Sequence, residues 1–352
     1  MTTSALPPAS ILKDVIARIA NGESLSEAQA EQAFEAIMSG DATPAQIGGL
    51  LMGLRVKGET VEEITAAARV MRAKVALIEA PEGAIDTCGT GGDASGTYNI
   101  STAAAFVAAG CGVPVAKHGN RAMSSKSGSA DVLTSLGIKI DADFPLVKRC
   151  LWENHIGFLM APRHHNAMRH VAGARVELGT RTIFNLLGPL ANPAGAKRQV
   201  MGVFSRHWVR PLAEVLGRLG AEHAWVVHGS DGLDELTTTG PSHVAEWVRG
   251  EVREFDVSPA DVGLPQARPE DLKGGDGATN AAALRAVLEG KTGPYRDIVL
   301  LNAAAALVVA GAVPDLKAGV ERAARAIGDG SAEAILTRMI AITNETPDTE
   351  SP

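Results

Sequence analysis

The chain has 352 residues, of which 45% are hydrophobic and 21% charged, as expected for a globular protein with one large domain and a smaller one. Its formal net charge of −7 argues against a general nucleic-acid-binding protein, which would be basic. No window reaches about 18 charge-free apolar residues, and no signal-peptide pattern is present, so we expect neither a membrane span nor secretion. Cys88, Cys111 and Cys150 lack CxxC spacing, so we expect no disulfide framework and a cytoplasmic location.

Residues 9–76 are predicted to form four helices and no strand. Ser26 with Gln29, Thr43 with Gln46 and Thr60 with Glu63 have capping-box spacing, and Pro44 suits a first helical position. Such helices cannot bury their apolar faces alone. They should therefore pack on the rest of the chain or on another subunit.

From residue 84 onwards, short apolar runs alternate with helical patterns. The strands are expected at 84–87, 113–116, 156–161, 199–204 and 224–228, and a hairpin at 244–247 and 252–255 around Arg249-Gly250. This alternation is typical of an α/β domain with a largely parallel sheet. The ligand site of such a sheet lies at the carboxyl ends of its strands.

Segment 162–196 interrupts this alternation with helix-like sequence that ends in Gly-Pro and Asn-Pro breakers. Closing helices are expected at 280–288, 297–310, 316–327 and 332–342, with alanine-rich faces in the core. Residues 344–352 are predicted to form a disordered polar tail.

The loop after the first expected strand contains Gly89, Gly91 and Gly92, where the missing Cβ atoms let the backbone approach a ligand closely. Asn99, Ser101 and Thr102 follow as natural capping residues of a helix. Because a helix N-terminus exposes unpaired N–H groups, this unit can hold a phosphate. A turn that serves only connectivity is the alternative.

The loop after the second strand repeats this arrangement with positive charge. It reads Lys117-His118-Gly119-Asn120-Arg121 and continues to a serine cluster at Ser124, Ser125, Ser127 and Ser129. Neither loop matches GxGxxG or GxxxxGK[ST], which argues against a dinucleotide site and a P-loop. Two such loops at neighbouring strand ends predict a ligand with two phosphate groups.

In this order and spacing, GTGGD, NIST, KHGNR and SSxSGSAD resemble the anthranilate phosphoribosyltransferase family, with a similar layout from about residue 10 to 343. The resemblance implies a small N-terminal all-helical domain and a large α/β domain with a mainly parallel central sheet, of the nucleoside phosphorylase and phosphoribosyltransferase kind. Residues 1–76, with 162–196, would form the first domain and 77–343 the second. The family often has glycine at Ala94 and phenylalanine at Tyr98, so this chain departs from it there.

The resemblance implies a reaction in which the amine of anthranilate displaces pyrophosphate from phosphoribosyl pyrophosphate, in tryptophan biosynthesis. The implied substrate-binding residues are Gly89, Gly92, Asp93, Thr97, Asn99, Ile100, Ser101, Thr102, Lys117, His118, Gly119, Asn120, Arg121, Ser124, Ser125, Ser129 and Arg175. Arg175 would hold the acceptor carboxylate, with Gly89, Asn120 and His118 nearby. No general base is identified, and Lys117, His118 and Asn120 would act by positioning.

Asp234 and Glu235, with Ser101, match the family's Mg²⁺ ligands; carboxylates together with substrate phosphates are usual for this ion. By themselves, Asp234 and Glu235 would suit a solvated turn. His164, His165 and His170 lack a metal-site spacing, so we expect no metal there. The alternatives are a pyrimidine nucleoside phosphorylase-like enzyme and a non-catalytic nucleic-acid-binding relative. We expect small-molecule substrates, a homodimer, and no nucleic-acid or membrane partner.

Overall fold

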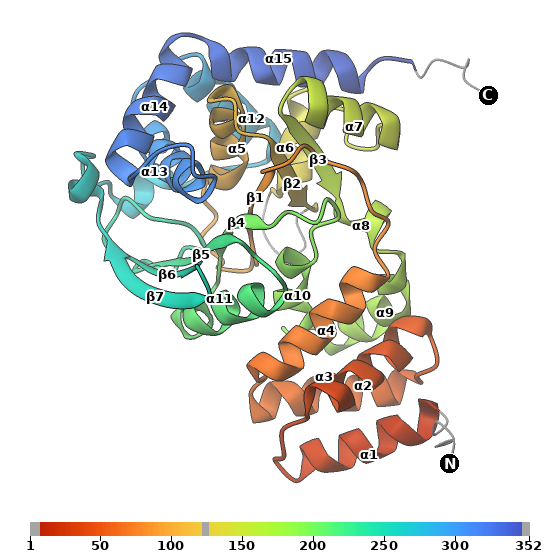
Figure 1. The fold of residues 1–352 in the computed structure, drawn as a ribbon. Coiled ribbons are helices and arrows are strands. Elements are labelled where there is room, and N and C mark those ends of the chain that lie inside the picture. The colour runs from red at the N-terminus through yellow and green to blue at the C-terminus, as the bar shows by residue number, and fades with distance from the viewer. Residues whose placement is uncertain (1–7, 122–126, 347–352) are drawn as a thin grey trace.

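A computed structural model describes residues 8–121 and 127–346, and Figure 1 shows a helical bundle at one end and a sheet with further helices at the other. Ser124 and Ser125 of the second loop lie outside the described residues, as do residues 347–352 of the expected tail. No helix in the described part of the chain is long and apolar enough to cross a membrane.

The four predicted N-terminal helices are present. They are α1 (Pro8–Ala20), α2 (Glu27–Ser39), α3 (Pro44–Lys57) and α4 (Val61–Ala73). All three predicted capping boxes form, and Pro44 is the first residue of α3. These starts were predictable because a capping box joins residues only three positions apart.

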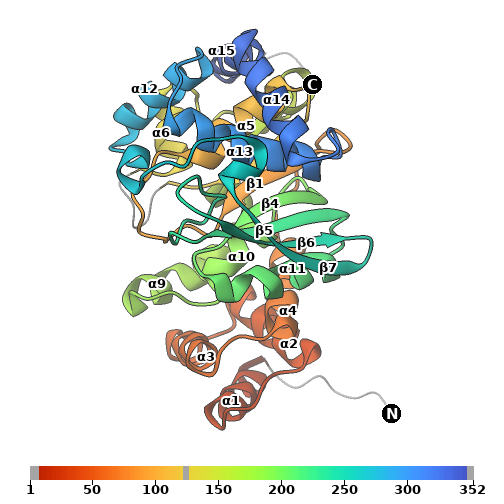
Figure 2. The same cartoon turned by 90° about the vertical axis from the view of Figure 1, so that its left-hand side faces the viewer.

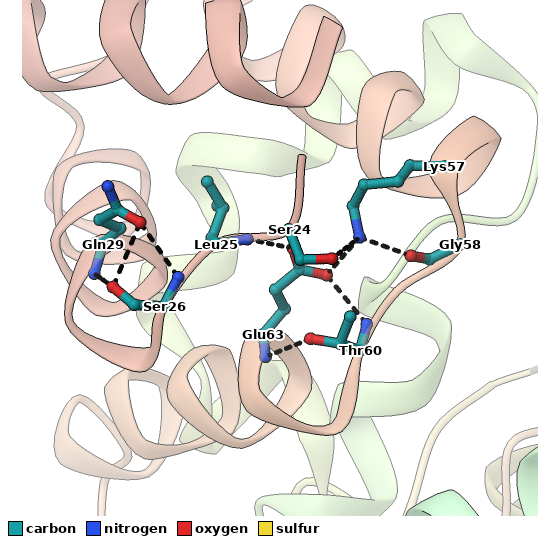
Figure 3. A network of polar contacts seen from close by, with 8 residues as sticks. All are labelled: Ser24, Leu25, Ser26, Gln29, Lys57, Gly58, Thr60 and Glu63. Atoms are coloured by element: carbon teal, nitrogen blue, oxygen red, sulfur yellow. Dashed lines mark hydrogen bonds and ion pairs between the residues drawn. The ribbon is translucent and has the colours of Figure 1, made fainter. Parts of the chain in front are cut away.

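Glu63 anchors the bundle through a fully buried carboxylate (Figure 3). Its oxygens accept hydrogen bonds from Leu25 N at 2.9 Å, Thr60 N at 2.9 Å and Lys57 Nζ at 3.0 Å. Lys57 also donates to Ser24 Oγ at 3.3 Å. Because every contact carries charge, the buried carboxylate is stabilised and ties the loop before α2 to the turn between α3 and α4.

The strands form one seven-stranded sheet in the order β3-β2-β1-β4-β5-β6-β7. They are β1 (Ile85–Gly89), β2 (Val115–Gly119), β3 (Ile156–Met160), β4 (Arg198–Gly202), β5 (His223–Gly229), β6 (Ser242–Val248) and β7 (Glu251–Val257). The first five are parallel, and β6 and β7 form the predicted hairpin. Its turn residues Arg249 and Gly250 have φ of 53° and 87°, as a tight hairpin requires. The predicted mainly parallel sheet is confirmed.

Two hydrophobic cores cover the two faces of the sheet. Figures 1 and 2 show the helices that lie on these faces. One core contains Ile85, Val200 and Val227 and packs against helices from the rest of the α/β part. These helices are α5 (Ile100–Gly110), α6 (Ser129–Ser135), α7 (Phe144–Glu153), α12 (Gly277–Leu288), α13 (Pro294–Val309), α14 (Leu316–Gly328) and α15 (Ser331–Thr343). The alanine run 303–306 of α13 is fully buried, as predicted for the closing helices.

The other core joins Met201 and Val226 of the sheet to the N-terminal helices. It includes α11 (Val209–Arg218) and two helices of segment 162–196, α9 (Arg169–Leu178) and α10 (Phe184–Leu190). Short elements complete the chain: α8 (Ala161–His164) and the 3-10 turns η1 (Asn166–Met168), η2 (Arg206–Trp208), η3 (Pro259–Val262) and η4 (Pro269–Leu272). Packing is therefore continuous from the bundle to the sheet.

The segments that pass between the bundle and the sheet are hydrogen-bonded to one another. Ala76 N donates to His164 O at 2.9 Å, and His164 Nδ1 lies 2.7 Å from Ala76 O. Ile78 N donates to Pro193 O at 3.1 Å. These hydrogen bonds hold the three connecting segments, at residues 76–78, at 164 and at 193, in place relative to one another.

The C-terminal prediction is wrong at its first residues. Asn344 Nδ2 donates to Gly137 O at 2.8 Å, and Glu345 Oε1 accepts from Arg149 NH2 at 2.8 Å. Composition alone did not indicate this order because both partners lie about 200 positions away in the sequence.

Candidate active site

The glycine-rich loop between β1 and α5 crosses the end of β4, where Thr90 N donates to Gly202 O at 2.9 Å. Gly91 and Gly92 have φ of 65° and 75°, a conformation that favours glycine. Ala94 also has a positive φ, 58°, so the position where the family often has glycine carries a strained alanine here.

Asp234 and Glu235 follow β5 and contact this loop and the start of α5. Gly91 N donates to Asp234 Oδ2 at 2.7 Å, and Ser101 N donates to Glu235 Oε1 at 3.0 Å. A Cβ on Gly89 would lie 2.3 Å from Asp234 Oδ2. Position 89 therefore requires glycine at least partly because Asp234 leaves no room for a Cβ, independently of any ligand. The prediction of a merely solvated turn at Asp234 and Glu235 does not fit these contacts.

Both carboxylates are half-buried and mutually repulsive. Removal from water, then Asp93 and Glu235, raise the pKa of Asp234 well above its usual value. Removal from water also raises the pKa of Glu235 to about 7, against the opposing effect of Lys117. A divalent cation would relieve this repulsion, so the donor set fits Mg²⁺. The described residues offer no cluster of three or more His, Cys, Asp or Glu ligands, so substrate oxygens would have to complete the shell.

Lys117 points from β2 towards α5. Its Nζ donates to Thr87 O and lies 3.4 Å from Ser101 Oγ, and the side chain is only 2% exposed. Burial lowers the pKa of this ammonium, while Asp86 is the largest of the effects that raise it. The lysine thus places positive charge beside the predicted metal ligands.

His118 points from the same strand to the opposite face, because side chains alternate along a strand. Its Nε2 lies 3.2 Å from His165 Nε2, and both rings are buried. Burial, followed by His165, lowers the pKa of His118 to about 3, and burial lowers that of His165 to about 4. Both rings are neutral near pH 7. Sequence reasoning considered His165 only as a metal ligand and missed this contact.

The start of α5 and the second loop lie side by side. Thr102 Oγ1 donates to Ser129 Oγ at 3.0 Å, and Asn99 Nδ2 donates to Ser127 O at 3.3 Å. Asn99 is the N-cap of α5, but the predicted capping bond from its side chain is absent among the described residues. Its Oδ1 instead accepts from Asn280 Nδ2 at 2.9 Å. The structure thus brings the two predicted loops together.

The remaining predicted site residues make contacts with other parts of the protein. Asp93 Oδ1 accepts from Ser95 N at 3.3 Å, which is the turn role considered for it. Ile100 is buried, and its N–H donates to Tyr98 O. Its side chain and its N–H group are therefore poorly placed to contact a ligand. Asn120 Oδ1 accepts from Arg121 N at 2.8 Å. Further contacts are Thr97 with Lys273 in a bridge, Arg121 with Asp131 in an ion pair, and Gly119 against the Phe158 ring.

Arg175 lies on α9, with its guanidinium carbon 5.5 Å from the centre of the Phe184 ring. Burial lowers the pKa of Arg175, and its guanidinium makes no hydrogen bond or ion pair within the described residues. Arg181 was not predicted. It donates to Gly92 O and stacks over Phe204 at 4.3 Å, linking the α9–α10 connection to the glycine-rich loop.

Two family models match the chain. The Glycosyl transferase family helical bundle domain matches residues 13–75, and the Glycosyl transferase family a/b domain matches residues 81–333. The anthranilate phosphoribosyltransferase of Paramagnetospirillum magneticum is 72% identical over 336 residues, which are 96% of this chain and 97% of that protein. That of Rhodospirillum rubrum is 70% identical over 94% of this chain and 95% of that protein.

Solved structures of anthranilate phosphoribosyltransferases have a similar fold. The crystal structure of anthranilate phosphoribosyltransferase from Thermus thermophilus has a TM-score of 0.89 and 45% identity, and the match covers 94% of this chain and 100% of that one. The Saccharomyces cerevisiae enzyme in complex with PRPP and Mg has a TM-score of 0.86 and 28% identity, over 95% and 98% of the two chains.

Proposed function

The chain belongs to the anthranilate phosphoribosyltransferase family, and we propose that it transfers the 5-phosphoribosyl group of phosphoribosyl pyrophosphate to the amine of anthranilate, in tryptophan biosynthesis. The amine nitrogen forms a bond to ribose C1, the bond from C1 to the pyrophosphate oxygen breaks, and the nitrogen loses a proton. The observation that carries this proposal is the joining of two anion-binding loops to Asp234 and Glu235 at one edge of the sheet.

We assign the donor to this edge. The glycine-rich loop, the first turn of α5 and Lys117 offer N–H groups, hydroxyls and an ammonium for phosphate oxygens. The donor residues are Gly89, Gly92, Asp93, Thr97, Asn99, Ser101, Thr102, Lys117, Asn120, Ser125 and Ser129, with His118, Gly119, Arg121 and Ser124 in the same stretch of sequence. Arg181 and Asn280 support the loop from outside.

Mg²⁺ would be held by Asp234, Glu235 and Ser101. When bound, it supplies positive charge that offsets the charge of the pyrophosphate. Lys117 adds a fixed charge on the same side, and its pairing with Thr87 O holds it in place. These residues favour departure of the pyrophosphate by electrostatic stabilisation.

We assign the acceptor to the side of the sheet where His118 and His165 lie. Arg175 would bind the anthranilate carboxylate, since a guanidinium suits a carboxylate and, among the described residues, this one stacks on Phe184 without a hydrogen bond or ion pair that would compete. Neutral rings at His118 and His165 let an uncharged aryl amine approach without adding positive charge. Positioning is thus the main catalytic effect on this side.

We further propose that residues 1–76 and 162–196 form one domain and the rest of 77–343 the other, and that the protein is a cytoplasmic homodimer through its helical part. Val56 on α3 and Val176 on α9 support the dimer, because both apolar side chains are exposed, 82% and 74% respectively, on helices that contact each other.

Loss of anthranilate fluorescence on addition of phosphoribosyl pyrophosphate and Mg²⁺ to the pure protein tests the function. Turnover should require all three components. Replacing Asp234 and Glu235 by alanine should abolish it at limiting Mg²⁺ with the melting temperature largely kept. Fluorescence that stays constant with the wild-type protein would overturn the proposal.

A further inference from the structure

Asp234 and Glu235 occupy two backbone N–H groups of the donor site. Gly91 N lies in the glycine-rich loop, and Ser101 N lies in the first turn of the 11-residue helix α5, where N–H groups have no partner within the helix. Such groups bind anions well. The carboxylate oxygens, at 2.7 and 3.0 Å, therefore stand where phosphate oxygens would accept the same hydrogen bonds.

We propose that Asp234 and Glu235 form an anion gate that makes the donor site selective for metal-complexed pyrophosphate. Without metal, the two carboxylates cap Gly91 N and Ser101 N and repel free phosphates. When they hold Mg²⁺, the two carboxylates would turn away from Gly91 N and Ser101 N and leave these N–H groups free for the donor phosphates. This inference rests on the proposed function, because it takes the donor to bind at these groups.

The hydrogen bonds of the gate support the exclusion of free anions. Gly91 N and Ser101 N each donate to a carboxylate oxygen, so a free phosphate must displace Asp234 or Glu235 before it can accept from either group. Bringing a phosphate to a site that already holds acidic side chains is costly for binding.

The packing of the loop implies that the side chains move and the backbone stays. A Cβ on Gly202 would lie 1.5 Å from Asp234 O, so the loop rests directly on the end of β4. Leu236 N donates to Asn302 Oδ1 at 3.1 Å, and Asn302 Nδ2 returns a bond to Leu236 O at 2.8 Å. The backbone is thus held between β4 and α13, and rotation of the two carboxylates suffices to open the gate.

The test is calorimetric titration with inorganic pyrophosphate, once in EDTA and once in Mg²⁺. The variants are the double change Asp234→Ala with Glu235→Ala, and the charge-only changes Asp234→Asn and Glu235→Gln. Asp231→Asn is the matched control, since Asp231 lies in the same loop but binds Thr237 and Thr239. It removes one charge without uncovering Gly91 N or Ser101 N.

In EDTA, the double alanine variant should bind pyrophosphate at least about tenfold more tightly than the wild type, and the charge-only variants should show a smaller gain in the same direction. Mg²⁺ should then strengthen binding to the wild type and leave the double variant unchanged. The Asp231→Asn control should follow the wild type.

If the wild type binds magnesium pyrophosphate but no variant gains affinity in EDTA, the gate is wrong and the proposed function stands. A wild type that binds pyrophosphate in neither buffer would remove the donor site, and the gate with it. Because the charge-only variants keep the side-chain shape, the test does not depend on the truncated variant folding.

Discussion

Asp86 Oδ2 accepts a 2.7 Å hydrogen bond from Asn192 Nδ2, although the two residues are 106 positions apart. The other carboxylate oxygen accepts from His118 N at 3.1 Å, and Asn192 Nδ2 also donates to Ala116 O at 2.8 Å. Asp86 and Asn192 thus join the returning segment after α10 to the end of β2. Asp86 is therefore a positioning residue for the Lys117-His118-Gly119-Asn120 segment.

Asp86→Asn should lower kcat about tenfold or more, because an amide cannot accept both hydrogen bonds and the end of β2 shifts. KM values should change less. The unpaired donor should also reduce the free energy of unfolding by about 1–3 kcal/mol. Steady-state kinetics and urea unfolding measure the two effects.

Gln199→Met is the control. Gln199 Nε2 is equally buried and donates to Pro189 O at 2.7 Å, but it does not bond to the end of β2. It should cost similar stability with kcat preserved. Equal losses of kcat in both variants would reduce Asp86 to a purely structural role.

His118 and His165 make stability depend on pH. Their pKa values of about 3 and about 4 lie below the ordinary 6.5, so the unfolded chain takes up protons first as the pH falls. Stability is therefore full above pH 6.5 and declines below it, by about 2 kcal/mol per histidine by pH 5. Urea unfolding at pH 7 and pH 5 should show this loss.

His165→Gln removes one titrating ring and keeps an amide near the position of Nε2. The loss between pH 7 and pH 5 should shrink by about 2 kcal/mol. The same change at His207, whose side chain is exposed, is the surface control. An undiminished slope in His165→Gln would contradict the burial argument.

Much of the fold could be predicted from the sequence, because its signals are local. Capping boxes join neighbouring residues, and strands appear as short apolar runs. That the glycine-rich loop and the second loop lie side by side was also predictable, because both follow neighbouring parallel strands. The contacts of Asp86 with Asn192, His165 with His118 and Arg181 with Gly92 were not, since these partners lie 106, 47 and 89 positions apart and no local pattern marks the pairs.

Arg175 and Arg181 lie six positions apart but should serve different substrates. Arg175→Ala should raise the KM for anthranilate about tenfold or more, with a much smaller effect on the donor, because a charge-assisted carboxylate contact is lost. Arg181→Ala should act mainly on the donor KM, since it frees Gly92 O. Separate titration of the two substrates measures this split. Equal effects of Arg175→Ala on both KM values would place Arg175 in general closure of the site.

The Glu63 carboxylate should matter for stability rather than activity. Glu63→Gln removes the buried negative charge that pairs with Lys57. The free energy of unfolding should therefore fall by about 3 kcal/mol. Glu35→Gln breaks the more exposed pair with Lys74 and should cost less than about 1 kcal/mol. Chemical denaturation of the two variants measures both losses of stability. A lower kcat in a fully folded Glu63→Gln protein would instead show that the helical bundle contributes to catalysis.

Gly89 and Gly92 test why the first loop needs glycine. The structure changes the expectation that ligand crowding alone excludes side chains, because both positions are already constrained without a ligand. Gly92 has φ of 75°, and its Cβ would lie 3.2 Å from Arg181 NH2, so Gly92→Ala should lower stability by about 1 kcal/mol and also weaken donor binding. Gly89→Ala places a methyl 2.3 Å from Asp234 Oδ2.

Gly89→Ala should therefore displace the Asp234 carboxylate and raise the Mg²⁺ concentration needed for half-maximal activity about tenfold, roughly 1.4 kcal/mol. Gly92→Ala should keep the wild-type Mg²⁺ dependence, because its Cβ points to Arg181 and not to Asp234. The measurements are the melting temperature without ligand, calorimetric binding of Mg²⁺-phosphoribosyl pyrophosphate, and rate against Mg²⁺ concentration. Normal Mg²⁺ dependence in a folded Gly89→Ala protein would mean that contact between Asp234 and the end of β1 is not needed to hold the metal.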